Sequence, residues 1–507
     1  MLAATPAGFA LLGLLLPAAS RRASGALGVG GALVATVAAV ALAMHGEPVR
    51  DSWHLVDFGN LPVSVTLQVS QAAALVAVAV GVVALAVQVY SLAYLRPDDR
   101  YAPYAAQVSL FTAAMLDVVV AGDLVMLLVG WEVMGICSYL LIAHDRELPE
   151  APRAAVKAFL VTRVGDVGFL LGIALLGISA RSFQLDDVLN APLSHGRLTL
   201  ATLLLLAGVA GKSAQFPLHT WLPDAMAGPT PISALIHAAT MVAAGVYVVT
   251  RLYPLFTAAP ATLAVLGVMA SVTMLLGALA ATAQDDVKRV LAWSTVSQIG
   301  YMSGALAVGA SGAALFHLLT HAAFKALLFL AAGCVIHAVG SNSMAVMGGL
   351  RRALPATFVC ATVGLAALAG VPPFAGFWSK DSVLSAAFEV RDGSGPAASW
   401  VAWLVWLAGL VAVLVTAWYC ARLWLRVFFG APRGDVEPHD IPPLMAWPVY
   451  ALAVPAALLG FAGLGSGLAG RLGAQRLYHF DAATVAALVA LVLGVGAGWA
   501  AWRRDTA

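Results

Sequence analysis

Three lysines of this chain lie within long apolar stretches, where a charged amine is energetically unfavourable. The chain has 27 lysines and arginines, only five of them lysines, and Lys212, Lys325 and Lys380 fall inside apolar windows. A charged amine at bilayer depth costs at least ~2.5–3.5 kcal/mol. Burial disfavours the charged form, so a buried amine can exchange protons near neutral pH, whereas arginine keeps its proton. The placement therefore favours proton exchange over a chance scatter of fixed charges.

Lys212 stands at the start of a segment that contains many helix-breaking residues. The prolines that follow it are Pro217, Pro223, Pro229 and Pro231. Each proline lacks a backbone donor and interrupts a helix. Broken helices at membrane depth occur where the freed backbone lines a cavity or a transport pathway. The segment therefore predicts a path for protons or ions.

Acidic and basic side chains also occur inside two earlier apolar windows. Glu132 lies in the middle of one of them, and we interpret it as the partner that sets the charge state of Lys212. The alternative is a neutral glutamic acid that bonds to backbone or to a serine. Arg163 and Asp166 are spaced i,i+3 on one helix face and predict an ion pair. This pair could lock the helix or could take part in gating.

Histidines continue the series of titratable groups. His237 follows the proline break, and by itself it is typical of a buried core histidine. His317, His321 and Lys325 are spaced i, i+4 and i+8, which places them on one stripe of about 80° that rises ~12 Å along a helix. Two imidazoles that titrate near neutral pH precede an amine, a pattern that predicts a proton relay.

A second broken window repeats the pattern of the first. Pro372 and Pro373 interrupt it, and Lys380 follows beside Asp381. The two proline-broken windows are five windows apart, which predicts two repeats of five helices. Since five is odd, the repeats should have inverted topology.

Composition sets the class of the protein. Hydrophobic residues make up 61% of the 507 positions and charged residues 10%, which is typical of a helical protein that crosses the membrane many times. A net charge of +2 gives no indication of a nucleic-acid partner. The four cysteines are isolated, so we expect no metal site and no redox cofactor in this chain.

Apolar windows predict an all-α polytopic membrane protein of about fifteen transmembrane helices. The expected helices are 2–20, 25–45, 66–95, 104–121, 123–143, 154–180, 197–224, 229–252, 260–283, 288–308, 311–339, 354–390, 399–428, 445–466 and 481–502. We expect helices 1–3 in residues 1–100, the first repeat in 101–252, the second in 253–430 and the last two helices in 431–507. Loops after odd-numbered helices carry sixteen basic residues and the others seven, which places the N-terminus outside and the C-terminus in the cytoplasm.

Six segments resemble the antiporter-like L subunits (chain 5) of respiratory NADH-quinone oxidoreductase, complex I, which are related to Mrp antiporters. The segments are GWEVMGICSYLLI, AAVKAFLVTRVGDVGFLLG, GKSAQFPLHTWLPDAMAGPTPISALIHAATMVAAGVY, DDVKRVLAWSTVSQIGYM, HLLTHAAFKALLFL and FAGFWSKD. The resemblance covers about residues 105–385. It implies fourteen core helices with two inverted repeats, each with a broken helix and a half-channel.

The resemblance also implies roles for the titratable residues. Glu132 and Lys212 would form the first half-channel, with Arg163 and Asp166 nearby. The central connection would consist of His237, His317, His321 and Lys325. Lys380 and Asp381 would form the exit toward the periplasm. The chain would be a proton-pumping translocase subunit in a bacterial inner membrane, with other membrane subunits as partners and quinone reduction taking place elsewhere in the complex.

The sequence ends at Ala507, soon after the last apolar window, so we expect no lateral helix of the kind that these L subunits carry. Related assemblies therefore remain as alternatives: an Mrp-type cation/proton antiporter, a membrane-bound hydrogenase, or a proton-conducting subunit of an inorganic-carbon uptake complex. The run DAMAGPTPISALIHAATMV is closer to the complex I form.

Overall fold

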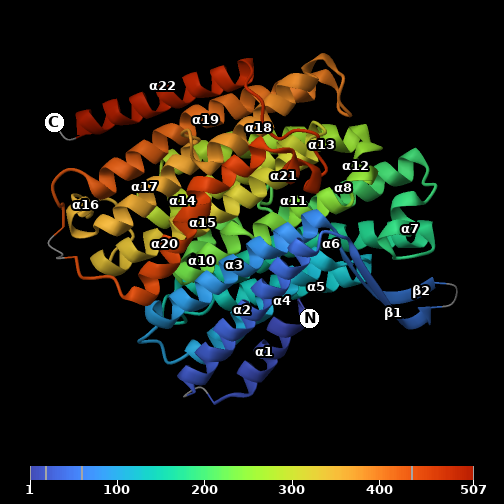
Figure 1. The fold of residues 1–507 in the computed structure, drawn as a ribbon, viewed down its shortest axis with the longest axis horizontal. Coiled ribbons are helices and arrows are strands. Elements are labelled where there is room, and N and C mark those ends of the chain that lie inside the picture. Colours follow the sequence, from blue (N-terminus) through green and yellow to red (C-terminus); the bar gives the residue numbers. More distant parts are fainter. Residues whose placement is uncertain (1, 18–19, 59–60, 435–437, 506–507) are drawn as a thin grey trace. The chain divides into compact units, whose positions relative to one another are not determined.

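A computed structural model describes residues 2–17, 20–58, 61–434 and 438–505 (Figure 1). The described residues form mainly helices, together with one β-hairpin. Contacts divide it into two compact units. The N-terminal unit is Met1–Gln88, Pro97–Ile232 and Ala239–Leu266, and the C-terminal unit is Val89–Arg96, Ser233–Ala238 and Gly267–Ala507. Each unit is described by itself.

The N-terminal unit contains the hairpin and most of the first half of the helices. Its elements are α1 (Ala4–Leu15), α2 (Arg21–His45), β1 (Val49–Phe58), β2 (Leu61–Val69), α4 (Tyr101–Val120), α5 (Leu124–Ile142), α6 (Glu150–Ala180), α7 (Leu185–Asn190), α8 (His195–Lys212), α9 (Trp221–Asp224), η1 (Ala225–Ala227), α11 (Met241–Arg251) and α12 (Tyr253–Thr257). The helices α3 (Gln71–Tyr94), α10 (Thr230–Ala238) and α13 (Pro260–Thr282) are divided between the two units.

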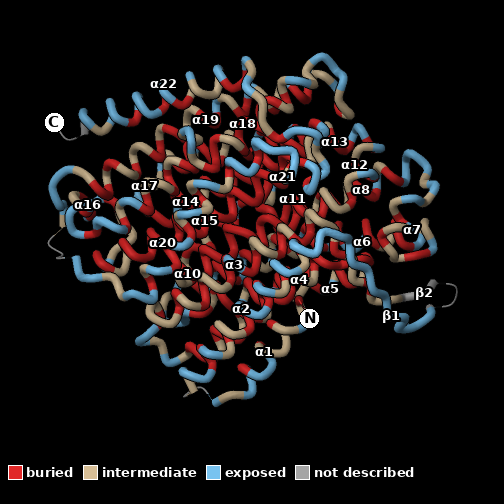
Figure 2. Tube along the Cα trace, in the orientation of Figure 1, coloured by how far each residue is buried: buried red, intermediate tan, exposed pale blue. Residues whose placement is uncertain are grey.

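The C-terminal unit is built around one long buried helix, α15. Its elements are α14 (Val287–Ala307), α15 (Ser311–Val339), α16 (Leu350–Ala353), α17 (Pro355–Ala369), α18 (Ala375–Glu389), η2 (Val390–Asp392), α19 (Ser399–Phe428), α20 (Pro443–Leu458), η3 (Leu459–Leu464), α21 (Ser466–Arg471) and α22 (Ala482–Asp505). The helices α14, α17, α18 and α20 pack against α15. Figure 2 shows α14 and α15 as buried along their length, whereas α22 is largely exposed.

Eleven helices are long and apolar enough to cross a membrane, among the residues that the structure describes. Their length fits the bilayer, since a hydrocarbon core of ~30 Å needs about 20 residues at 1.5 Å each. The helical membrane fold is therefore as predicted, but the expected number of about fifteen helices is not confirmed. The windows at 197–224 and 354–390 are interrupted, and each is divided into shorter helices.

The β-hairpin is an element that the apolar windows did not predict. Strands β1 and β2 are antiparallel, with Val49 opposite Val69. Asp123, directly before α5, accepts a hydrogen bond of 2.7 Å from the amide of Thr66, and the Thr66 hydroxyl donates to Gln184 at 2.8 Å. These bonds fix the hairpin to the start of α5 and to the segment before α7.

Candidate functional site

The first group of buried charges lies in the N-terminal unit, where α8 meets α6. Lys212 is the last residue of α8, and its Nζ lies 3.1 Å from Oδ2 of Asp166 on α6. Both side chains are almost completely buried, at 0% and 1% exposure. The indole N–H of Trp131 on α5 donates to Oδ1 of Asp166 at 2.6 Å. Since each carboxylate oxygen has a donor, this buried charge is compensated.

Glycines bring α6 and α8 close enough for this contact. A Cβ on Gly165 would lie 2.5 Å from the Ala207 carbonyl oxygen, and a Cβ on Gly208 would lie 2.5 Å from Cβ of Phe169. Neither position has room for a larger residue. Small residues at helix contacts allow close approach of the two backbones in a membrane. The glycines therefore bring the end of α8 to Asp166.

The broken end of α8 also favours a cation. The last carbonyl groups of a helix lack partners within the helix and carry partial negative charge. The indole N–H of Trp221, which opens α9, donates to the Gly211 carbonyl at 2.9 Å. Lys212 occupies the last position of the same helix, so it lies at the C-terminal end of the helix dipole, which favours a cation.

Glu132 and Arg163 lie beside this pair and bond to each other. Arg163 forms a salt bridge with Glu132, and its Nη1 lies 3.8 Å from Oδ2 of Asp166. The ion pair that we predicted between Arg163 and Asp166 is therefore the longer of the two contacts. The direct partner of Lys212 is Asp166, not Glu132 as the sequence suggested. Two cations and two carboxylates balance one another in this cluster.

Gly135 is also part of this cluster, although it was not among the predicted site residues. A Cβ at this position of α5 would lie 2.5 Å from Nζ of Lys212 and 3.5 Å from Nη2 of Arg163. The space that its missing side chain leaves is therefore occupied by the two cations. A glycine three residues after Glu132, within an apolar helix, was the available signal.

The second group lies in the C-terminal unit along α15. His317, His321 and Lys325 are completely buried on this helix, as their spacing predicted. The rings of His317 and His321 are 6.1 Å apart between centroids. His317 bonds through Nδ1 to the Ser379 hydroxyl at 2.9 Å and through Nε2 to Oε1 of Gln298 at 3.2 Å. His317 thus connects α15 with α14 and α18.

Lys325 lies at the other end of this row of side chains on α15, and its hydrogen-bond partners are neutral. Its Nζ donates to the Leu291 carbonyl at 3.0 Å and to the Ser294 hydroxyl, both on α14. No carboxylate pairs with it among the described residues. Its environment therefore stabilises a charge by hydrogen bonds alone, in contrast to that of Lys212.

The remaining histidine of the predicted connection, His237, lies at the end of α10. Its ring is 4.8 Å from the Phe329 ring of α15, between centroids. Neither of its ring nitrogens has a hydrogen-bond partner among the described residues. His321 lies next to the backbone of Ala238, but its nitrogens reach no well-formed hydrogen bond. Buried polar atoms of this kind require partners such as ordered water.

Lys380 lies at the second broken helix. The helix α17 ends at Gly370, whose φ of +87° is the left-handed conformation that glycine adopts readily. Nζ of Lys380 on α18 donates to the Leu368 carbonyl of α17 at 2.5 Å, and it lies 5.4 Å from the Tyr301 ring centroid. The amine of Lys380 thus contacts the carbonyl end of an interrupted helix, whereas that of Lys212 contacts a carboxylate.

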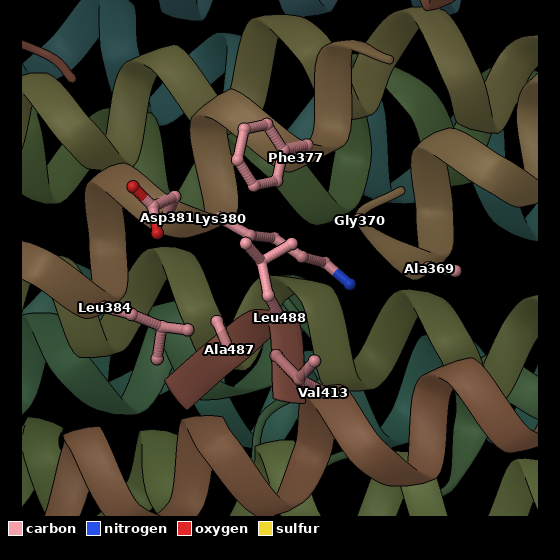
Figure 3. A pocket seen from close by; sticks show the side chains of 9 residues that line it. All are labelled: Ala369, Gly370, Phe377, Lys380, Asp381, Leu384, Val413, Ala487 and Leu488. Carbon is pink, nitrogen blue, oxygen red and sulfur yellow. The ribbon is translucent and has the colours of Figure 1, made fainter. Parts of the chain in front are cut away.

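Asp381 points away from Lys380, as Figure 3 shows. Adjacent residues on a helix do not face each other, which is why these two side chains point in different directions. Both line a cavity of about 20 Å³, together with Ala487 and Leu488 of α22. This space can hold about one water molecule. Oδ2 of Asp381 accepts a hydrogen bond of 3.0 Å from the Thr484 hydroxyl of α22.

In the part of the chain that the structure describes, no group of three or more histidine, cysteine, aspartate and glutamate side chains is placed to bind a metal ion. The four cysteines are buried and free.

Comparisons with known proteins identify the family to which this chain is similar. The family model for NADH:quinone oxidoreductase/Mrp antiporter transmembrane segments matches residues 121–408, and the model for the N-terminus of complex I chain 5 matches 53–105. A relative in Picosynechococcus sp., NAD(P)H-quinone oxidoreductase chain 5, is 41% identical over 80% of this chain and 65% of its own length. NADH-quinone oxidoreductase subunit L of Mycobacterium tuberculosis is 44% identical over 79% of this chain and 64% of its own.

A solved structure is also similar to this chain. The structure of the Mrp complex from Dietzia sp. aligns with 98% of this chain at a TM-score of 0.86 and 29% identity, and the match covers 55% of that chain. The chain thus spans somewhat less than two thirds of the length of these curated relatives. The family match includes both broken helices and all three buried lysines, and the chain belongs to the NADH:quinone oxidoreductase/Mrp antiporter transmembrane family.

Proposed function

We propose that this chain is a proton-translocating membrane subunit of a NADH-quinone oxidoreductase-like respiratory complex. It would lie in the cytoplasmic membrane of a bacterium beside other membrane subunits, with its N-terminus outside. Its own part of the reaction would be proton transfer only, because the side chains at its sites are amines, imidazoles, carboxylates and hydroxyls. The electron carriers would belong to other subunits.

The observation that carries the proposal is the burial of three amines, each with a hydrogen-bond acceptor at its nitrogen. Lys212, Lys325 and Lys380 are 0%, 0% and 3% exposed. Each has a hydrogen-bond acceptor at its nitrogen, and that acceptor is a carboxylate only at Lys212. Desolvation brings the charged and neutral forms of such amines closer in free energy, so that neighbouring charges can shift the proton.

The first cluster has the partners needed for such a shift. When Lys212 gives up its proton, Asp166 keeps the indole donor of Trp131 and the nearby guanidinium of Arg163. Asp166 therefore keeps two of its partners when the amine is neutral. Movement of Arg163 between Glu132 and Asp166 would then bias the charge on Lys212.

In the C-terminal unit, a proton would pass between Lys325 and Lys380 along the histidines. His321 and His317 lie in order between Lys325 and Ser379, which directly precedes Lys380. Hydrogen-bonded imidazole and hydroxyl groups are able to accept and donate in turn. The unpartnered nitrogens of His237 and His321 give places where ordered water can join the path.

Replacement of Lys325 by methionine tests the proposal. Methionine fills a similar volume without a proton to transfer, so the complex should assemble while proton pumping is lost. The measurement is dye-detected acidification by the purified complex in liposomes, with quinone reduction followed in parallel. Lys157→Met is the matched control, because Lys157 is 43% exposed and pairs with Asp224. Normal pumping by Lys325→Met would rule the proposal out.

Exchange of Na⁺ or K⁺ for protons is the second candidate function, and the Mrp structure that aligns with 98% of this chain favours it. An antiporter would acidify or alkalinise liposomes in response to a cation gradient without an electron donor. A respiratory pump would respond to the donor and a quinone, with or without Na⁺. The two activities can be measured on the same preparation.

A further inference from the structure

Polar side chains continue from Asp381 and Thr484 toward the protein surface, and those beyond Thr484 belong to none of the sites described above. The Thr484 hydroxyl lies 3.0 Å from Oδ2 of Asp381 and 3.1 Å from Oδ1 of Asp481. The Ser385 hydroxyl also donates to Oδ1 of Asp481, at 3.1 Å. Thr484 thus connects a carboxyl group on α18 with a carboxyl group at the start of α22.

The series continues from Asp481 to the surface. Nε2 of His479 lies 3.4 Å from Oδ2 of Asp481 and 2.9 Å from Oε1 of Glu389. Exposure rises in the same order, from 2% at Asp381 to side-chain values of 18% at Asp481, 28% at His479 and 58% at Glu389. The line begins in the buried interior and ends in solvent.

Three observations at the buried end indicate that these groups do more than hold a helix in place. Oδ1 of Asp381 is buried and has no hydrogen-bond partner among the described residues. The carboxyl group also lines the cavity that it shares with Lys380. The single hydroxyl proton of Thr484 can be donated to only one of its two carboxyl neighbours at a time. Both contacts are hydrogen bonds only when one of the carboxyl groups carries a proton.

We propose that Asp381, Thr484, Asp481, His479 and Glu389 form an outlet that carries protons from the Lys380 cavity to the surface. This inference rests on the proposed function. Asp381 would give its proton to Oγ1 of Thr484, whose own hydroxyl proton passes to Asp481. Asp481 then protonates Nε2 of His479, and the imidazolium releases the proton to Glu389 or to water. One proton crosses, and rotation of the hydroxyl restores the starting state.

The direction agrees with the distribution of basic residues in the sequence. Glu389 and His479 lie in connections that also hold Arg391, Arg471 and Arg476, and these connections belong to the side with few basic residues. That side is the one predicted to face outward. The outlet therefore opens on the face where a respiratory pump releases its protons.

The alternative is that Thr484 and Asp481 serve only to cap α22. The amide of Thr484 donates to Oδ1 of Asp481 at 2.9 Å, and the amide of Asp481 donates to Oγ1 of Thr484 at 3.2 Å, which is a reciprocal cap. Asparagine is as good a cap as aspartate but transfers no proton. Asp481→Asn therefore separates the two roles.

The experiment compares variants of the assembled complex in liposomes. Thr484→Val and Asp481→Asn should reduce proton pumping by about tenfold while the amount of assembled complex stays unchanged. Thr484→Ser keeps the hydroxyl and should restore pumping. Asp392→Asn is the matched control, because Asp392 lies three residues after Glu389 and bonds to Ser394 instead.

The outcomes distinguish this inference from the proposed function. If Lys325→Met stops pumping while Thr484→Val and Asp481→Asn pump at the normal rate, the outlet proposal is wrong and the proposed function stands. Equal losses in Thr484→Val and Thr484→Ser would also contradict the outlet, since a role of the hydroxyl predicts rescue. Normal pumping by Lys325→Met would remove the basis of both.

Discussion

At the scale of single residues, the sequence identified the charged side chains of the first cluster but not their pairing. Lys212, Glu132, Arg163 and Asp166 were all predicted, yet Asp166 and not Glu132 contacts the amine. Side chains from three helices meet here, and their rotation about each helix axis is set by tertiary packing. Periodicity along one helix carries no information on which of two carboxylates faces a residue on another. Gly135 shows the same limit, because its importance depends on Lys212 and Arg163, whose cationic groups occupy the space where its side chain would be.

Gly135→Ala should displace the ammonium of Lys212. The added Cβ would lie 2.5 Å from Nζ, and the flexible lysine end can move away more easily than the backbone. Loss of the 3.1 Å contact with Asp166 should lower proton pumping several-fold, while alanine favours the helix by about 1 kcal/mol and maintains assembly. Pumping per assembled complex is the measurement. Gly196→Ala is the control, since nothing lies within 4 Å of its Cβ, and equal pumping by both variants would contradict the role of Gly135.

At the scale of elements, apolar windows located helices well and interruptions poorly. The expected helix at 311–339 matches α15, and the one at 399–428 matches α19. The helix predicted at 197–224 ends earlier, at Lys212, because the chain turns there, before Pro217. The hairpin was missed although alternating residues flank the dipeptide Gly-Asn at 59–60 of the sequence, which is a typical hairpin signal.

Gly165→Ala should loosen the contact between α6 and α8. Its Cβ would lie 2.5 Å from the carbonyl oxygen of Ala207, which belongs to the backbone and cannot turn aside. We expect a loss of stability of about 1–3 kcal/mol, as for other overpacked positions. The fraction of solubilised protein that stays monodisperse after heating measures this loss. Gly496→Ala on α22 is the control, since its Cβ would meet open space and the variant should be as stable as the parent protein. If Gly165→Ala were also as stable as the parent protein, the helices could separate at this contact without loss of stability.

At the scale of the whole molecule, composition and hydropathy were sufficient for the fold class, and the motifs for the family. Contacts between distant parts of the sequence were not predictable. Thr484 is 103 positions from Asp381, and its helix α22 carries no charge near that contact, so the sequence pattern gave no indication of it. The expected boundaries of the repeats stay a prediction, since the two compact units describe packing and not repetition.

Variants of the three buried lysines test whether the two units transport protons in series or along parallel paths. If Lys212, Lys325 and Lys380 act in series, the loss of any one amine stops the flow at that point. Lys212→Met and Lys380→Met should then each reduce pumping to a background level, and the double variant should be no worse than either single one. Such non-additivity is typical of groups that act as a unit.

Parallel paths would give a different pattern of rates. Each unit would then conduct on its own, so each single variant would keep about half of the pumping and only the double variant would abolish it. Pumping normalised to quinone reduction measures the difference, with Lys157→Met as the exposed control on α6. Retention of half the rate by Lys212→Met and by Lys380→Met would show that protons need not pass both buried amines, and the series arrangement would have to be abandoned.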